Sequence, residues 1–131
     1  MAEAVRIPIR WRDADALGHV NNAVYLTYLE ELLAVVLGPV LGDDYVTARV
    51  EMDFRSEIRL GEKEVIGTAA VERIGTSSLT VATRLTRGDG ETALDARLVL
   101  VAWDPGRRCS RPLTDAEKQQ LESLDRGTTE A

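Results

Sequence analysis

The sequence predicts an α+β protein in which a curved antiparallel sheet wraps one long central helix. First, apolar residues recur at three- and four-residue spacing from Val24 to Leu37, which is typical of a helix. Second, apolar and polar residues then alternate through most of Tyr45–Trp103, which is typical of strands. Third, the breaks between these strands are too short for helical crossovers and therefore favour antiparallel pairing. One sheet curling around one apolar helix satisfies all three observations.

The chain begins with a predicted edge strand. Over Val5–Trp11, Val and Ile residues and the final Trp alternate with Arg and Pro. Pro8 has no amide hydrogen to donate, so this strand should lie at an edge of the sheet or contain a bulge. The short acidic segment Arg12–Gly18 that follows is predicted to be a loop.

The helix should begin just after this loop and end near residue 38. Asn21 or Asn22 can cap it, because an Asn side chain accepts hydrogen bonds from the first free amides. Gly38 and Pro39 are expected to stop it. Its last ten residues are apolar on nearly every side, which predicts that protein surrounds it.

The remaining chain completes a single domain, 1–131. A tight turn is predicted at Gly88-Asp89-Gly90, and the sheet should end at Asp104-Pro105-Gly106. A short helix is then predicted at about 114–124, followed by a flexible tail, 125–131. Unpaired sheet edges favour pairing with a second copy, so a homodimer or homotetramer is expected. The four strands after the helix are predicted at Tyr45–Ile58, Glu64–Ile74, Ser78–Arg87 and Thr92–Trp103.

Composition narrows the classes of function. The 131 residues carry a formal charge of −6, which argues against binding nucleic acid through a general basic field. A single cysteine, Cys109, allows no internal disulfide, and we see no signal peptide, so a cytoplasmic location is expected. We see no apolar run long enough for a membrane span. One histidine and no cysteine pair make a metal site improbable, and no cofactor is predicted.

The densest polar cluster comes directly before the long helix. Asp15 supplies a carboxylate suited to act as base or nucleophile, and His19 is the only histidine. The start of the helix supplies free N–H groups and the positive end of the helix dipole. These groups could hold a thioester carbonyl and stabilise the oxyanion formed on attack.

This segment resembles the hotdog-fold acyl-CoA thioesterases, particularly the 4-hydroxybenzoyl-CoA thioesterase-like group. The resemblance rests on the run Asp13-x-Asp15-x-x-Gly18-His19-Val20-Asn21-Asn22, followed by Tyr25-Leu26-x-x-Leu29-Glu30-Glu31. It extends more weakly over Val5–Trp103. The same core recurs in acyl-carrier-protein thioesterases, so it indicates the superfamily better than the substrate.

The resemblance implies a role for several residues. Asp15 matches the catalytic aspartate, as nucleophile or general base, and Asn22 matches the position whose backbone N–H polarises the carbonyl. Tyr25 and Glu30 match helix positions near the active site, and His19 matches a residue that shapes the pocket. The family implies the hotdog fold, an acyl-CoA substrate and dimers or tetramers with sites across subunit interfaces.

One departure concerns the carrier. The comparable strand turn of the 4-hydroxybenzoyl-CoA enzyme holds the nucleotide phosphates with a basic cluster, whereas the turn at 73–78 here has one arginine, Arg73. Either other residues bind the nucleotide or the carrier is not CoA. Arg55, Arg59, Arg73 and the pair Arg107-Arg108 are the candidates, with solvated surface arginines as the simpler reading of each.

Simpler readings exist for the other residues too. The simpler reading of Asp15 is that it caps a turn, and that of Asp13 is a structural role. Asn21 is first a cap residue, and its side chain is also a candidate substrate contact. Tyr25 is most simply a core residue. Of the two helix glutamates, one should face solvent or an arginine, and Glu30 is favoured to orient water at the site.

Three functions therefore remain open. The first is hydrolysis of an acyl-CoA thioester, or of an acyl-carrier-protein thioester. The second is a non-hydrolytic acyl-thioester binding protein on the same scaffold. The third is a hotdog enoyl-CoA hydratase or dehydratase, which would need Asp15 and His19 as an acid–base pair. The sequence does not reveal the length of the acyl chain.

Overall fold

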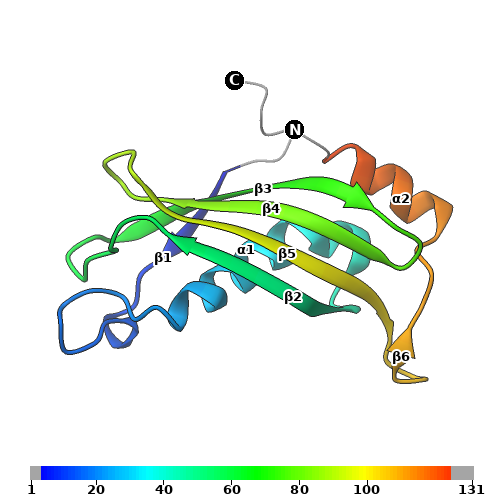
Figure 1. The fold of residues 1–131 in the computed structure, drawn as a ribbon, viewed down its shortest axis with the longest axis horizontal. Coiled ribbons are helices and arrows are strands. Elements are labelled where there is room, and N and C mark those ends of the chain that lie inside the picture. The colour runs from blue at the N-terminus through cyan, green and yellow to red at the C-terminus, as the bar shows by residue number, and fades with distance from the viewer. Residues whose placement is uncertain (1–3, 125–131) are drawn as a thin grey trace.

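The structure, a computed structural model, describes residues 4–124 (Figure 1). The predicted tail, 125–131, lies outside the described residues. The strands are β1 (Val5–Pro8), β2 (Tyr45–Phe54), β3 (Glu64–Ile74), β4 (Ser78–Thr86), β5 (Thr92–Asp104) and β6 (Cys109–Ser110). The helices are α1 (Val24–Leu41) and α2 (Asp115–Glu122), and a 3-10 turn spans Trp11–Asp13.

The sheet has the order β1-β3-β4-β5-β2, and β6 adds to β5 as a short hairpin. Every pair is antiparallel, as predicted. β2 and β3, which follow each other along the chain, do not pair with each other, however. β2 pairs with β5 along the edge opposite β1, because the segment 55–63 carries the chain across the end of the sheet before β3 begins (Figure 1).

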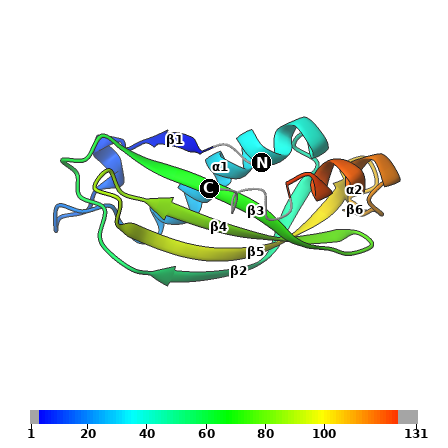
Figure 2. The same cartoon turned by 90° about the horizontal axis from the view of Figure 1, so that it is seen from above.

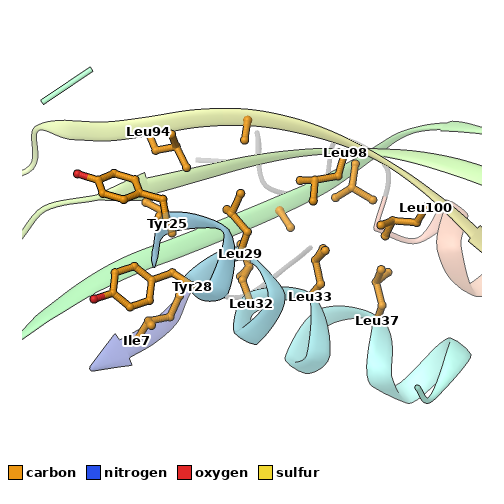
Figure 3. Close-up of a cluster of buried hydrophobic side chains, with 14 of the residues drawn as sticks. Ile7, Tyr25, Tyr28, Leu29, Leu32, Leu33, Leu37, Leu94, Leu98 and Leu100 are labelled. Carbon is orange, nitrogen blue, oxygen red and sulfur yellow. The ribbon is translucent and has the colours of Figure 1, made fainter. Parts of the chain in front are cut away.

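The helix α1 packs on one face of this curved sheet (Figure 2). Its buried side chains meet the inward-facing residues of β3, β4 and β5, which form one continuous core (Figure 3). Burying each such leucine contributes roughly 1.5–3 kcal/mol. The buried helix residues are Tyr25, Tyr28, Leu29, Leu32, Leu33, Leu37 and Leu41.

The prediction that protein surrounds the helix is wrong for a single chain. The sheet covers only one side of α1, and Val35 on the other side is 57% exposed. Ala34 and Pro39 are exposed as well. By length and apolar composition α1 could also cross a membrane, which corrects the expectation that no segment could. In this structure it is a core helix with one uncovered face.

The ends of the helix also differ from the prediction. The residue before the helix is Ala23, and no side chain caps it. Gly38 and Pro39 do not stop it: the missing amide hydrogen of Pro39 falls in the last turn, where it costs one hydrogen bond. The helix ends when Gly42, with a φ of 60°, donates its N–H to the carbonyl of Gly38 at 2.9 Å.

The other boundaries are mostly close to those predicted. β1 is an edge strand, as Pro8 indicated, but it ends there, and Trp11 is 82% exposed in the 3-10 turn rather than in a strand. β2 stops at Phe54 instead of Ile58. The sheet does not end at 104–106, since β6 follows. α2 begins as predicted, after Thr114, which forms a capping box with Glu117.

Candidate active site

The loop before α1 is held in a compact shape by its own backbone. Asp15 donates its N–H to the carbonyl of His19 at 2.9 Å, and Gly18 donates to the carbonyl of Asp15 at 3.1 Å. Gly18 has a φ of 84°, which favours glycine at this turn. Val20 donates to the carbonyl of Ile58 at 2.6 Å. The loop is thereby fixed to the segment that follows β2.

Asp13 is a structural carboxylate. Its side chain is buried, and Oδ2 accepts the hydroxyl of Tyr28 at 2.6 Å and the backbone N–H of Arg10 at 3.0 Å. Burial, and then the hydrogen bond to Asp13, raises the pKa of Tyr28 well above its usual range. The backbone carbonyl of Asp13 also accepts the N–H of Asn21 at 3.0 Å. The structural reading of Asp13 is supported.

Among the described residues, one carboxylate oxygen of Asp15 has a hydrogen-bond partner and the other has none. Oδ1 accepts the N–H of Leu17 at 2.9 Å, which is the turn-capping contact considered above. Oδ2 lies 4.0 Å from Nδ1 of His19, too far for a hydrogen bond. The side chain is 26% exposed. The same residue can therefore hold the turn with one oxygen and present the other to a ligand or water.

His19 is oriented by the backbone rather than by Asp15. Its Nδ1 lies 3.2 Å from the carbonyl oxygen of Val20. A neutral ring that donates from Nδ1 keeps Nε2 as an acceptor. His19 also pairs with Arg59 in an isolated antiparallel bridge. The backbone of His19 is thus held against the segment after β2.

One N–H at the start of the helix is left unengaged. Asn21 donates to Asp13, and Ala23 donates to the side-chain oxygen of Asn21 at 2.9 Å. The N–H groups of Val24 and Tyr25 close backbone turns. Within residues 4–124, the N–H of Asn22 has no acceptor. The expected row of free amides is thus reduced to a single donor, at the predicted position.

Asn22 lines a small hollow of about 220 Å³, here called the Tyr25 hollow. The ring of Phe54 meets that of Tyr25 edge-on, with centroids 5.1 Å apart, and burial raises the pKa of Tyr25. The hydroxyls of Tyr25 and Tyr28 point toward the same end of the molecule (Figure 3). The hollow is lined by His19, Asn22, Tyr25, Phe54, Arg55, Ser56 and Glu57.

Four predicted residues therefore meet here: His19, Asn22, Tyr25 and Arg55. Asp15 lies beside His19, without lining the hollow. Phe54, Ser56 and Glu57 also line the hollow but were not predicted, because the strand predicted at Tyr45–Ile58 places them in its interior. The position of the strand end was the feature that could have identified these residues, because the chain crosses the end of the sheet there, close to the helix start.

The other predicted residues lie elsewhere in the single chain. Asn21 holds the turn before α1 through its side chain. Glu30 is exposed and lines a separate hollow with Tyr45 and Thr47, at the beginning of β2. Arg73 is exposed near the end of β3 and lies away from the Tyr25 hollow. The sheet register shows this: Arg73 is level with Val99 of β5, through Thr80 of β4, whereas Phe54 is level with Leu94, five residues away along β5.

The second helix glutamate pairs with an arginine, as expected for one of the two. Glu31 accepts from Arg10 at 2.7 Å.

Within residues 4–124, no group of three or more His, Cys, Asp or Glu side chains is placed to hold a metal ion.

A curved antiparallel sheet packed on one long helix is the arrangement of the hotdog fold. Residues 17–94 match the thioesterase superfamily model, and the chain belongs to this superfamily. No curated protein matches the chain.

Solved structures give the same fold. A thioesterase from Thermus thermophilus, solved with coenzyme A and Zn, has 35% identity and a TM-score of 0.82, covering 93% of this chain and 92% of its own. A predicted thioesterase from Bacillus stearothermophilus has 22% identity and a TM-score of 0.87, with 95% and 97% covered. A putative acyl-CoA thioesterase from Xanthomonas campestris has 32% identity and a TM-score of 0.69, with 79% and 93% covered.

Proposed function

We propose that this protein hydrolyses an acyl-CoA thioester to the free acid and CoA. The observation that carries the proposal is that one short loop supplies two suitable groups: at the helix start the N–H of Asn22, which has no acceptor within residues 4–124, and Oδ2 of Asp15, which accepts no hydrogen bond from those residues. The Thermus thermophilus relative was solved with coenzyme A, and the Xanthomonas campestris relative carries the name of an acyl-CoA thioesterase. Both support CoA as the carrier.

In this mechanism the thioester carbonyl oxygen accepts the N–H of Asn22. The positive end of the α1 dipole adds to this donor, so negative charge that develops on the oxygen is stabilised. Asp15 Oδ2 takes a proton from a water molecule whose oxygen attacks the carbonyl carbon. The C–S bond then breaks, and the leaving thiolate takes the proton from Asp15, which returns to its carboxylate form. Attack by Asp15 itself, followed by hydrolysis of the anhydride, uses the same geometry.

A thiol-release assay on short, long and aromatic acyl-CoAs tests the proposal. We expect Asp15→Asn to lower kcat by about 10²–10⁴-fold, the usual contribution of a general base. Asp115→Asn in α2 is the matched control and should keep the wild-type rate. A wild-type protein that is inactive on every chain length, or an Asp15→Asn variant as fast as the wild type, would show that this mechanism is wrong.

The other two functions are outcomes of related measurements. Acyl-CoA binding without turnover would indicate a binding protein. The hydratase reading depends on Asp15 and His19 acting together, and their separation of 4.0 Å is short enough to close on ligand binding. Hydration of an enoyl-CoA, in the absence of thiol release, would favour it.

We also propose that two copies pair through β2. This ten-residue strand is an edge of the sheet, and most of its side chains are exposed in the single chain. Unpaired edges of this length are usually covered. A two-fold antiparallel pair centred on Val50 places Arg49 opposite Glu51 of the second copy. In a single chain these two side chains contact each other at 3.1 Å.

Such a pair would also explain the position of Glu30. Antiparallel pairing brings the beginning of β2 in one copy beside its end in the other. The hollow containing Glu30 and Tyr45 of the second copy then adjoins the Tyr25 hollow, at Phe54. The predicted role of Glu30 at the site thus depends on the dimer.

Charge exchange at the centre of β2 tests the pairing. Arg49→Glu or Glu51→Arg alone places like charges opposite each other and should raise the dimer dissociation constant about tenfold in sedimentation velocity. The double variant Arg49→Glu/Glu51→Arg should restore it. A monomeric wild-type protein, or single variants that dimerise normally, would argue against pairing through β2.

A further inference from the structure

A second, larger hollow borders the same loop. It has a volume of about 580 Å³ and is here called the Arg87 hollow. Arg59, in its wall, forms a backbone bridge with His19, and the N–H of Leu60 donates to the carbonyl of Gly18 at 3.1 Å. The segment 55–63, the β4–β5 hairpin and the loop before α1 meet at this end of the molecule (Figure 1). The lining residues are Arg59, Glu62, Lys63, Glu64, Arg87, Gly88 and Asp89.

The two hollows adjoin at the backbone bridge between His19 and Arg59, since His19 lines the smaller one and Arg59 lines the larger one. Burial is the main cause of the raised pKa of Tyr25, and Glu62 raises it further whereas Arg87 lowers it. Tyr25 lines the smaller hollow, and Glu62 and Arg87 line the larger one. A ligand that fills both would therefore lie across the bridge between His19 and Arg59.

Arg87 carries the strongest signal for an anionic ligand. Its side chain is 16% exposed, and Nη2 binds Asp89 at 2.9 Å. Nε is buried and, within residues 4–124, has no hydrogen-bond partner, since Glu62 lies 3.8 Å away. A buried donor left unpaired costs roughly 1–3 kcal/mol. Arg87 lines the hollow, and the described residues leave this charged side chain only partly paired, which favours an anionic ligand beside it.

Lys63 adds a charge that the protein leaves uncompensated. Its side chain is exposed and, in the described part of the chain, forms no ion pair, whereas Glu64 already pairs with Arg6 at 3.2 Å and Asp89 with Arg87. Lysine and arginine together are the usual ligands of phosphate oxygens. Because the chain as a whole carries a charge of −6, an anionic substrate needs such a local cationic site.

We infer that the Arg87 hollow binds a phosphate group of the pantetheine carrier while the acyl thioester occupies the Tyr25 hollow. This inference rests on the proposed function. It places the phosphate on Lys63 and Arg87, beside Arg59, which also pairs with Glu57 at 3.0 Å. This site lies at the opposite end of β3 from the turn that carries Arg73. The phosphate can belong to CoA or to the phosphopantetheine arm of an acyl carrier protein, since both present the same chemistry.

The test compares one acyl group on three carriers: CoA, 4′-phosphopantetheine and unphosphorylated pantetheine. Lys63→Gln should raise KM for acyl-CoA roughly fivefold, as expected for one exposed charge contact. It should raise KM for acyl-phosphopantetheine equally if the phosphate nearest the pantetheine lies in the hollow. The KM for acyl-pantetheine should stay at the wild-type value. Lys118→Gln in α2 carries the same change of charge and is the matched control. Arg87→Gln should have a larger effect than Lys63→Gln.

The carriers separate the two sources of phosphate. A rise in KM for acyl-CoA alone places the nucleotide phosphates in the hollow, and an equal rise for acyl-phosphopantetheine places the phosphate nearest the pantetheine there. Either result supports the inference. Lys63→Gln and Lys118→Gln variants with the same KM, or a KM that rises equally for acyl-pantetheine, would overturn it.

A binding measurement keeps this inference separate from the proposed function. In calorimetry, adenosine 3′,5′-bisphosphate and 4′-phosphopantetheine are titrated into wild-type protein and into Lys63→Gln. If no thioester is hydrolysed but the variant binds one of these ligands about fivefold more weakly, the hydrolase proposal fails and the phosphate site stands. If thioesters are hydrolysed and the variant binds both normally, the phosphate site fails alone.

Discussion

The same substitution at two aspartates of one loop should affect different properties: Asp13→Asn should lower stability, and Asp15→Asn should lower kcat. Asp13 is 7% exposed and its Oδ2 accepts Tyr28 at 2.6 Å and Arg10 at 3.0 Å. Asp13→Asn removes the charge that strengthens both hydrogen bonds, which should cost about 2–3 kcal/mol of unfolding free energy. For a chain of this size that corresponds to a fall in Tm of roughly 6–10 °C.

Asp15→Asn should leave stability nearly unchanged. The only hydrogen bond of the Asp15 side chain within residues 4–124 is to the N–H of Leu17, and an asparagine oxygen accepts it equally well. The change in unfolding free energy should stay within about 0.5 kcal/mol, while kcat falls as stated above. Urea unfolding and thiol release, measured on both variants, give the comparison. The reasoning is refuted if Asp15→Asn is as destabilised as Asp13→Asn, or if Asp13→Asn unfolds like the wild type.

Two further predictions concern packing and pH. A Cβ on Gly67 would lie 3.1 Å from Leu32 Cδ1 and 3.2 Å from Ile7 Cδ1, so Gly67→Ala should cost roughly 1–3 kcal/mol by overpacking; urea unfolding with Gly61→Ala as control, where no atom lies within 4 Å, checks this. The hydrogen bonds from Arg111 lower the pKa of Glu117 from 4.5 to about 2. Because the folded-state pKa is the lower one, the stabilisation is complete above pH 4.5 and is lost as the pH falls toward 2. Glu117→Gln should therefore cost about 1–2 kcal/mol at pH 7 and progressively less below about pH 4.5, and equal costs at pH 7 and about pH 2.5 would contradict the assignment.

Local signals in the sequence determined most of the elements and the location of the site. Alternation placed β3 at the bounds that the structure has, and the helix predicted at about 114–124 contains α2, which begins at Asp115. These features depend on neighbours along the chain, so periodicity and capping are sufficient to predict them. The cluster around Asp15, His19 and Asn22 was identified for the same reason: its members lie within one short loop.

Tertiary structure decided what depends on contacts between distant segments. Strand order did, because a short connection at the end of the sheet does not reveal whether β2 pairs with β3 or crosses to β5. The completeness of the site did as well, since Phe54 and Arg59 reach the loop only after the chain has turned past the helix start. Alternation in sequence records which face a side chain occupies, but it carries no information on which segment covers that face. Only the folded chain therefore shows that one side of α1 is left bare and that, among the described residues, Arg87 has a buried N–H without an acceptor.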